Sequence, residues 1–491
     1  MHEIPNSFDV GLIKKVYGYQ FDVQKVASIS EITDFDGSSI FIDEQENICT
    51  FETSPLIDFH INIHSDLGSI IVVNNKESSS YISEIQHVRR RESIAMTPAN
   101  CLTALQKSTN IQTTQSTSNL QANKSSVKEC IKEITEAPTK ALVASSGLSI
   151  QYAILMGLIH DAIDNHPNKS IKIVVPPNCY GGTNDQARRI AACLPNVDIV
   201  DLPVDGDNDM VQSIEQVLTT IANEDAVPYI IAEIPTNPRV EVPNLVDLSN
   251  ALGKKRTTTT GEIAVAPVFI LDQTFCPNVH FLGDNELLAN VKTISFASGS
   301  KFPSGGKCTA GYCVGNSKTT DLIAKIELHL NLCDNEATAL QYEILAEQIP
   351  SMLDRIQGAY ANTRDFVNYI EEVLPEAKIN FVSESLATQG FTPSVFSLDL
   401  PTKGDSDEER EAYKRALNLK LINMMISRIP TESKHCVSYG QLKGCYWTIP
   451  ATSTQGTTKE GDKDYIARVA LSATMDLALH KKVFLDFVNS L

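Results

Sequence analysis

The chain has 491 residues, a formal net charge of -19, 42% hydrophobic residues and 21% charged residues. This length allows a sizeable core and two or three domains, and the composition is that of an ordinary globular protein. Because nucleic-acid phosphates are bound by clustered Lys and Arg, the acidic balance argues against a nucleic-acid partner. The basic cluster Arg89-Arg90-Arg91 is too short to reverse this balance, and we expect it to be a solvated helix end or loop.

The 11 cysteines are scattered without CxxC pairs or histidine partners at metal-ligand spacing. Neither a zinc site nor a disulfide framework is therefore expected. Isolated cysteines within apolar runs are typical of a reducing compartment. No apolar stretch approaches membrane-spanning length, and the N-terminus lacks the basic start and apolar core of a signal peptide. We expect a cytoplasmic protein with no metal and no membrane partner.

Residues 1–105 alternate short apolar runs with polar turns, and the runs at 40–42 and 70–73 predict strands. No chemistry is evident in this region, which we interpret as an N-terminal extension of unknown role. Residues 106–126 are crowded with Ser, Thr, Asn and Gln and nearly free of apolar side chains. This polar tract predicts a flexible linker or an inserted loop.

From residue 127 the pattern changes to alternating helices and strands. Short apolar runs bounded by turn residues predict strands at 141–144, 171–175, 227–232, 268–271 and 292–301. Such runs indicate an α/β fold with a mostly parallel sheet covered on both faces, whose functional residues gather at the carboxyl ends of the strands. A helical pattern over 337–374, which Pro350 should kink or divide, leads to a small α+β domain. We expect an extension (1–105), a large domain (106–355, including the polar tract) and a small C-terminal domain (356–491).

Polar turns follow three of these strands. Residues 145–148, Ser-Ser-Gly-Leu, precede an apolar helix, so their backbone N–H groups and the helix N-terminus are suited to a phosphate. Tyr180, which precedes two glycines, is suited to stack on a planar ring. Asn237, within the Glu-Ile-Pro-Thr-Asn-Pro of residues 233–238, is suited to donate a hydrogen bond to such a ring. Each turn alone is equally well an ordinary structural element: a tight strand-to-helix turn, a tyrosine capping the core or a proline-rich turn.

Asp272 and Lys301 end the next two predicted strands. A carboxylate in the place of Asp272 pairs with a pyridinium nitrogen and makes the ring an electron sink. A lysine whose pKa is lowered by burial reacts with an aldehyde and moves protons, and Ser298 and Ser300 are candidate phosphate donors. Taken singly, Asp272 is equally well a helix or turn cap, and Lys301 is equally well a solvated lysine after an edge strand. Together, the five sites in chain order match the needs of an enzyme that uses pyridoxal 5'-phosphate.

The sequences of these motifs and their order resemble those of the Cys/Met-metabolism family of pyridoxal phosphate enzymes. This family includes cystathionine γ-synthase, the cystathionine lyases and methionine γ-lyase. The similarity covers about residues 120–491. It includes the Ser-Gly-Leu phosphate loop, Tyr-Gly-Gly, Glu-x-Pro-Thr-Asn-Pro, Asp-x-Thr-Phe and the Ser-x-Ser-Lys that ends at Lys301. Residues 438–440, Ser-Tyr-Gly, resemble the family's Ser-Leu-Gly loop. Residues 468–472, Arg-Val-Ala-Leu-Ser, are similar to the strand whose arginine grips the substrate carboxylate.

The resemblance implies an aspartate-aminotransferase-like fold (fold type I of the pyridoxal phosphate enzymes) and a homotetramer built from dimers, with active sites at subunit interfaces. It implies catalytic roles for Lys301 and Tyr180, and substrate binding by Arg468 and Ser438. The residues implied in cofactor binding are Gly147, Leu148, Tyr180, Asn237, Asp272, Ser298, Ser300 and Lys301. The implied reaction is transsulfuration, a replacement or elimination at the β- or γ-carbon of an amino acid. The Asn-Cys-Tyr-Gly-Gly sequence of residues 178–182 favours a cystathionine γ-synthase-like reaction over a lyase.

The chain departs from the family at three places. The Tyr-x-Arg segment that holds a neighbouring subunit's cofactor phosphate is missing near residues 118–125, and one of the arginines at 89–91 is a hypothetical replacement. Residues 440–444, Gly-Gln-Leu-Lys-Gly, replace the usual Gly-Gly-x-Glu-Ser, so Lys443 either attracts an acidic leaving group or points into solvent. Gln455 stands in place of a histidine. Three alternatives remain: a lyase of the same family, a weakly active cofactor-binding homologue that serves as a partner subunit, and an aminotransferase of the same fold.

Overall fold

A computed structural model describes residues 119–204, 209–436, 441–450 and 465–491, together with the backbone of five strands before residue 119. These five are β1 (Phe21–Val26), β2 (Ser38–Ile42), β3 (Ile48–Glu52), β4 (Phe59–His64) and β5 (Gly68–Val73). Strand β4 pairs in parallel with β1 and antiparallel with β5, while β2 and β3 form an antiparallel pair. The strands predicted at 40–42 and 70–73 are confirmed.

The central sheet, built from residues 142–315, has seven strands in the order β6-β12-β11-β10-β9-β7-β8. Strand β12 is antiparallel to β11 and β6, and the other pairs are parallel. The strands are β6 (Leu142–Ala144), β7 (Ile171–Val175), β8 (Val197–Asp201), β9 (Val227–Glu233), β10 (Val268–Asp272), β11 (Lys292–Ser298) and β12 (Gly311–Gly315). The mostly parallel sheet is confirmed. Strands β8 and β12 were not predicted, and β11 ends at Ser298, three residues before the predicted end at Lys301.

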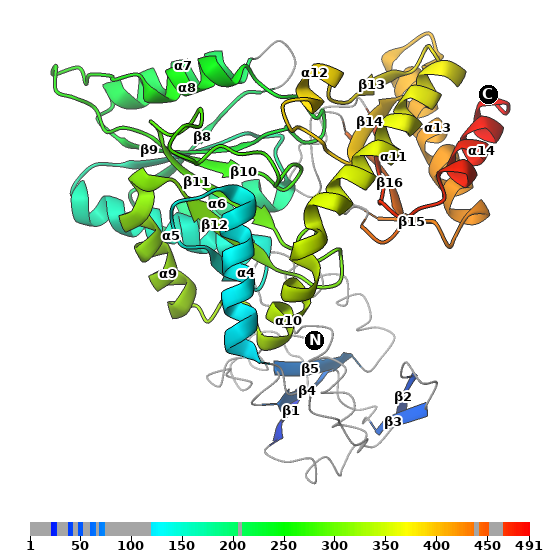
Figure 1. The fold of residues 1–491 in the computed structure, drawn as a ribbon, viewed down its shortest axis with the longest axis horizontal. Coiled ribbons are helices and arrows are strands. Elements are labelled where there is room, and N and C mark those ends of the chain that lie inside the picture. The colour runs from blue at the N-terminus through cyan, green and yellow to red at the C-terminus, as the bar shows by residue number, and fades with distance from the viewer. Residues whose placement is uncertain are drawn as a thin grey trace. The chain divides into compact units, whose positions relative to one another are not determined.

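Helices cover both faces of this sheet because its strands are apolar on both sides. Ile230 and Phe269 belong to one buried cluster and Ile231 and Ile270 to the other. The first cluster includes residues of α4 (Leu120–Thr135), α7 (Met210–Asn223) and α8 (Leu245–Gly253). The second includes residues of α5 (Gly147–Asn165), α6 (Gly181–Cys193) and α9 (Thr320–Leu332). In Figure 1, α7 and α8 lie on one side of the sheet, and α5 and α9 lie on the other.

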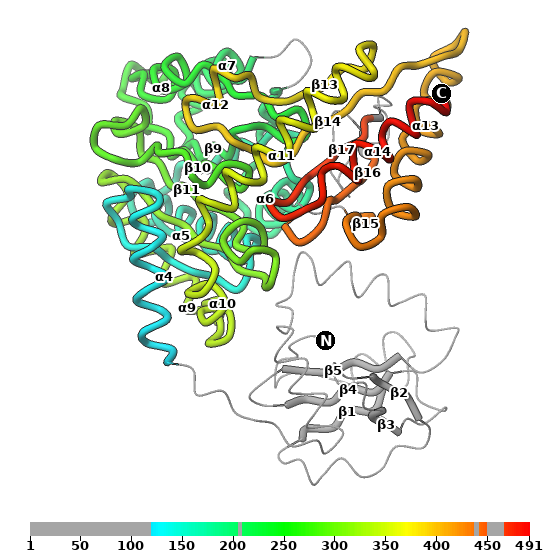
Figure 2. Tube along the Cα trace, turned by 45° about the vertical axis from the view of Figure 1, so that its right-hand side comes forward, coloured from blue at the N-terminus to red at the C-terminus, as the bar shows by residue number. Residues whose placement is uncertain are grey.

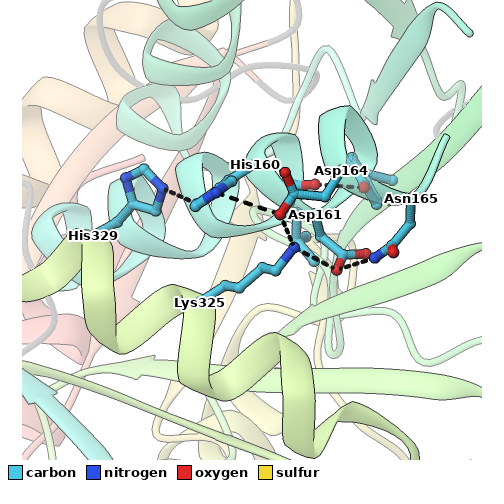
Figure 3. Close-up of polar contacts among 8 residues, drawn as sticks. His160, Asp161, Asp164, Asn165, Lys325 and His329 are labelled. Atoms are coloured by element: carbon cyan, nitrogen blue, oxygen red, sulfur yellow. Dashed lines mark hydrogen bonds and ion pairs between the residues drawn. The ribbon is translucent and has the colours of Figure 1, made fainter. Parts of the chain in front are cut away.

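Polar contacts fix α5 against α9 at the surface. Lys325 Nζ lies 3.1 Å from an oxygen of Asp161 and 2.6 Å from an oxygen of Asp164, and His329 Nε2 lies 3.2 Å from His160 Nδ1 (Figure 3). Partly exposed ion pairs contribute little to stability, roughly 0–1 kcal/mol. The buried cluster that both helices share therefore contributes most of the stability of this contact.

The helical pattern predicted over 337–374 is divided at Pro350, as expected. Helix α10 (Ala339–Gln348) is followed by a 3-10 turn, η4 (Ile349–Ser351), and then by α11 (Met352–Val373). A second 3-10 turn, η3 (Ser317–Thr319), precedes α9. Proline removes one backbone donor and clashes with the preceding turn of an α-helix, which accounts for the interruption.

The C-terminal part contains a five-stranded sheet in the order β13-β14-β17-β16-β15. Its strands are β13 (Lys378–Asn380), β14 (Val395–Asp399), β15 (Ser433–His435), β16 (Gly444–Pro450) and β17 (Tyr465–Ala470). The helices are the short α12 (Glu384–Ala387), α13 (Asp407–Arg428) and α14 (Leu477–Val488). Figure 2 shows α13 and α14 beside β16 and β17, and their apolar residues form a third buried cluster with α11. The predicted α+β character of this domain is confirmed.

The polar tract 106–126 is not a linker throughout, because α4 already begins at Leu120. Tertiary contacts stabilise this helix: Val127 and Ile131 are buried, and Lys124 forms an ion pair with Glu336 at 2.9 Å. By its internal contacts the chain divides into Met1–Asn119 with Ala339–Gln341, and Leu120–Thr338 with Tyr342–Leu491. The domain boundaries at 105 and 355 stay predictions. Within the described residues, no helix is long and apolar enough to cross a bilayer.

Candidate active site

Lys301 lies in the turn that follows β11, close to the carboxyl end of the central sheet. The turn is closed by two backbone hydrogen bonds, from Gly299 N to Ala310 O (2.6 Å) and from Ser304 N to Gly299 O (3.0 Å). Burial and the neighbouring guanidinium of Arg468 lower the pKa of Lys301 to about 8, although Asp272 acts in the opposite direction. A substantial fraction of this amine is therefore neutral near physiological pH, as a nucleophile or base requires.

The ends of β9, β10 and β11 lie side by side. Glu233 is paired in register with Asp272, so β9 and β10 end at one level, and Asp272 is paired with Phe296, two residues before the end of β11. Burial raises the pKa of Asp272 to about 6, against the hydrogen bond that its Oδ1 accepts from Thr274 N at 2.9 Å. Thr274 Oγ1 in turn accepts a hydrogen bond from Ser298 N at 3.0 Å. The carboxylate predicted to face a pyridinium nitrogen is thus held by the chain segment that leads toward Lys301.

Glu233 is a buried carboxyl group that the sequence analysis named only as part of a motif. Its two oxygens accept hydrogen bonds from Tyr180 N at 2.7 Å and Asn237 N at 3.2 Å. Burial and the nearby Asp272 raise the pKa of Glu233 to about 8, although both hydrogen bonds favour the ionised form. Glu233 therefore connects two turns that were predicted to contact the cofactor. The signal for it was a charged residue at the end of an otherwise apolar strand, Val227–Glu233.

The N-terminus of α5 lies against Ser298. The Ser146 hydroxyl caps this helix by accepting a hydrogen bond from Ser149 N at 3.0 Å. A Cβ at Gly147 would lie 3.1 Å from Ser298 Cβ and 3.2 Å from Ser298 Cα, which is a tight contact, so a larger residue would require Ser298 to shift by a few tenths of an ångström. The Ser298 and Ser300 hydroxyls lie 2.9 Å apart. Backbone N–H groups of a helix N-terminus and two hydroxyls therefore gather in one place, which suits a phosphate.

Leu148 follows Gly147 in the first turn of α5, and its carbonyl oxygen accepts a hydrogen bond from Gln186 Nε2 at 3.0 Å. This contact joins α5 to α6, the helix that begins directly after Tyr180. The Tyr180 side chain is 42% exposed and is therefore not a core tyrosine. Its ring lies so close to Gly182 that a Cβ there would come within 2.6 Å of Cε1. An open aromatic ring beside a glycine turn is suited to stacking.

Arg468 lies on β17 of the C-terminal sheet and donates a hydrogen bond from Nη1 to Asn237 Oδ1 at 3.0 Å. Its charge also contributes to the lowered pKa of Lys301. The small domain therefore brings its arginine to the strand ends of the large domain, where Asn237 and Lys301 lie.

Some predicted residues fall outside the described part of the chain: Ser438, Gln455 and the arginines at 89–91. Lys443 is described, and its Nζ donates a hydrogen bond to Pro430 O at 3.0 Å. This hydrogen bond lies at the surface, and the two roles considered for Lys443 stay predictions. Gly306, in the loop after Lys301, lies against Leu442: a Cβ on this glycine would be 3.4 Å from Leu442 Cγ.

No family model and no curated protein matches this chain. Solved structures do match. A cystathionine γ-synthase from Xanthomonas oryzae pv. oryzae in complex with cystathionine has 15% identity and a TM-score of 0.54, with 74% of this chain and 85% of that chain covered. A methionine γ-lyase from Micromonospora echinospora has 19% identity and a TM-score of 0.54, over 74% and 86% of the two chains. A cystathionine γ-lyase from Lactobacillus plantarum complexed with L-serine has 16% identity and a TM-score of 0.54, over 75% and 85%.

The chain therefore has fold type I of the pyridoxal phosphate enzymes, in its cystathionine γ-synthase-like form. This confirms the fold class predicted from the motifs. At these identities the likeness defines the fold alone.

The residues at the strand ends fit pyridoxal 5'-phosphate. A phosphate is matched by the α5 N-terminus with Ser298 and Ser300, and a planar ring by the exposed face of Tyr180. A pyridinium nitrogen is matched by the carboxyl group of Asp272, and an aldehyde by the amine of Lys301. The close approach of Gly147 to Ser298 brings the start of α5 beside these hydroxyls.

Proposed function

We propose that the protein is a pyridoxal phosphate-dependent enzyme that makes or breaks a carbon–sulfur bond at the β- or γ-carbon of an amino acid. The observation that carries this proposal is the arrangement of Lys301, in the turn after β11, with Asp272 at the end of β10 and Arg468 on β17 of the small domain. The cystathionine-forming and carbon–sulfur-cleaving activities of the matched structures support the choice of reaction class.

The bound cofactor would supply an electron sink that stabilises negative charge next to the amino-acid α-carbon. Lys301 would hold the cofactor covalently, then take the α-proton on Nζ and pass it to a neighbouring carbon. Asp272 would keep the ring nitrogen protonated. Asn237 would hold the ring by hydrogen bonding, and Tyr180 would cover its face and exchange protons through its hydroxyl. Gly147, Leu148, Ser298 and Ser300 would hold the phosphate.

Substrate binding would depend on the guanidinium of Arg468, whose planar group suits the two oxygens of an α-carboxylate. Ser438 would add a second substrate contact, by resemblance to the family's Ser-Leu-Gly loop. The contact to Asn237 already orients the arginine toward the strand ends. Binding in a fixed orientation places the α-proton within reach of Lys301. Holding the two reacting groups in this geometry increases the rate of proton transfer.

Within this class the proposal favours a cystathionine γ-synthase-like replacement, and the alternative is a lyase of the same fold. Two coupled assays separate them. The first supplies an activated homoserine with cysteine and measures cystathionine, and the second supplies cystathionine and measures pyruvate or 2-oxobutyrate. Keto acid without cystathionine synthesis would refute the synthase reaction and favour the lyase.

The test of the whole proposal is the visible absorbance of the purified protein after addition of pyridoxal phosphate, with Lys301→Ala in parallel. We expect the band of a lysine-bound cofactor in the native chain and not in the variant. If neither protein shows the band, the chain is a homologue without a working cofactor site, and a role as partner subunit of an active enzyme takes its place.

The proposal also includes a cytoplasmic homo-oligomer, a tetramer by resemblance, with active sites at subunit interfaces. Light scattering at several protein concentrations measures the assembly. A titration of pyridoxal phosphate against a variant with alanine at 89, 90 and 91 then asks whether those arginines replace the missing family cation. Unchanged affinity would reject that replacement.

A further inference from the structure

Hydrogen bonds between the chain segments of β10 and β11 continue beyond the end of β10. In the parallel ladder Asp272 is paired with Phe296, and the next backbone bond runs from Gln273 N to Phe296 O at 2.9 Å. A regular parallel ladder would continue with a bond from Ser298 N to the Gln273 carbonyl. Ser298 N instead donates to the side-chain oxygen of Thr274, Oγ1, at 3.0 Å. The Thr274 hydroxyl therefore takes the place of a backbone acceptor.

The backbone of Thr274 makes a second contact, with the carboxyl group of Asp272. Thr274 N donates a hydrogen bond to Asp272 Oδ1 at 2.9 Å. Burial raises the pKa of Asp272 to about 6, and hydrogen bonding by Thr274 acts in the opposite direction, toward the ionised form. Thr274 therefore holds this carboxyl group through its backbone and the end of β11 through its side chain.

The end of β11 carries the hydroxyls of the proposed phosphate site. Ser298 Oγ lies 2.9 Å from Ser300 Oγ, and a Cβ at Gly147 would lie 3.2 Å from Ser298 Oγ. The contact between Ser298 and the start of α5 is therefore tight. A small movement of the Ser298 backbone would change the position of its hydroxyl relative to the backbone N–H groups of the helix N-terminus.

We propose that Thr274 is a positioning residue, which sets the separation between the phosphate site at Ser298 and the carboxyl group of Asp272. A cofactor held at its phosphate and at its ring nitrogen needs these two sites at a fixed separation. Thr274 acts through Asp272 and Ser298, by the two hydrogen bonds at 2.9 and 3.0 Å. This inference rests on the proposed function, because it names a residue that fits the site to its cofactor.

Thr274→Val separates the two contacts of this residue. Valine has nearly the shape of threonine and keeps the backbone N–H that reaches Asp272, but it has no side-chain acceptor for Ser298 N. Only the end of β11 that carries the phosphate site is therefore released. Thr274→Ser keeps a hydroxyl at the same position and should restore the native behaviour.

Thr139→Val is the matched control. Thr139 Oγ1 also accepts a hydrogen bond from a backbone N–H, that of Gly315, at 2.8 Å. Gly315 is paired with Ile294, near the start of β11, whereas Ser298 is the last residue of this strand. The control therefore loses the same kind of hydrogen bond within the same sheet, away from the proposed phosphate site.

The experiment compares two aldehydes on the full chain by absorbance titration. Pyridoxal 5'-phosphate carries the phosphate, and pyridoxal has the same ring without it. We expect Thr274→Val to bind pyridoxal phosphate roughly tenfold more weakly, as for the loss of one hydrogen bond to a charged group, and to bind pyridoxal as the native chain does. Thr274→Ser and Thr139→Val should keep the native ratio of the two affinities. An unchanged ratio in Thr274→Val overturns the inference.

The native chain separates this inference from the proposed function. If neither aldehyde gives a band with the native chain, the proposed function is rejected and inorganic phosphate becomes the probe. Phosphate should then raise the melting temperature of the native chain and of Thr139→Val more than that of Thr274→Val, and equal rises overturn the inference. If Thr274→Val is unfolded by circular dichroism, Thr274→Ala takes its place, because it removes the same acceptor without adding a methyl group.

Discussion

Arg468 donates a hydrogen bond to Asn237 across 3.0 Å, from β17 of the small domain to the turn that follows β9 of the large domain. A second contact, from Ser397 Oγ to Pro238 O at 2.5 Å, joins β14 to the same turn. The arginine proposed to bind the substrate is therefore oriented before any substrate arrives. Preorganisation of this kind reduces the entropy lost on binding.

Arg468→Lys should weaken substrate binding while the cofactor band persists, because a lysine cannot make a planar two-point contact with a carboxylate. Loss of a hydrogen bond to a charged group costs about 1.5–3 kcal/mol, which corresponds to roughly a 10- to 150-fold fall in kcat/KM. Steady-state kinetics measures this. Arg428→Lys is the matched control, since Arg428 forms an exposed ion pair with Asp486. Equal KM values for Arg468→Lys and the native chain would contradict the assignment.

Asp272→Asn should shift the pH dependence of cofactor attachment to lower pH. Only the neutral amine reacts with an aldehyde, and the pKa of Lys301 is lowered to about 8 by burial and Arg468 while Asp272 raises it. Removing the carboxylate removes the raising effect, so the neutral amine persists to lower pH. The rate of appearance of the cofactor band, measured from pH 6 to 9, reports the midpoint. Asp284→Asn, an exposed position, is the control, and a shift to higher pH would be the wrong sign.

Glu233→Gln should change the pH dependence of stability of the cofactor-free protein. Burial and Asp272 raise the folded-state pKa of Glu233 to about 8, above an unfolded value of about 4.3. Between these values the folded state binds more protons than the unfolded state, so stability falls as pH rises through this window. The substituted amide does not titrate, so the slope of the urea midpoint against pH from 5 to 8 should flatten. Exposed Glu241→Gln should leave the native slope unchanged.

The sequence predicted the strands that carry the site because each is an apolar run that ends in a polar motif, as in β9 and β10. It did not predict β8, whose alternating Val-Asp-Ile-Val-Asp is half exposed at the sheet edge and lacks a continuous apolar run. The start of α4 at Leu120 was also missed, because the polar first turns are held by contacts such as Lys124 with Glu336.

Contacts between distant segments account for the rest of what the sequence could not predict. Glu233 was visible as a charged strand end, but its hydrogen bonds to Tyr180 N and Asn237 N depend on how two turns fold around it. Periodicity reports which face of an element is buried, and it carries no information about which turn a polar group meets.

Gly147→Ala should weaken cofactor binding more than it weakens the fold. The added Cβ would lie 3.1 Å from Ser298 Cβ and 3.2 Å from Ser298 Cα, so either the α5 N-terminus or Ser298 has to shift by a few tenths of an ångström. Overpacking of this kind costs about 1–3 kcal/mol, and we expect roughly a tenfold or greater loss of pyridoxal phosphate affinity in an absorbance titration. Gly253→Ala is the matched control, because its Cβ would meet nothing within 4 Å. Equal cofactor affinity of the two variants would place the phosphate away from the start of α5.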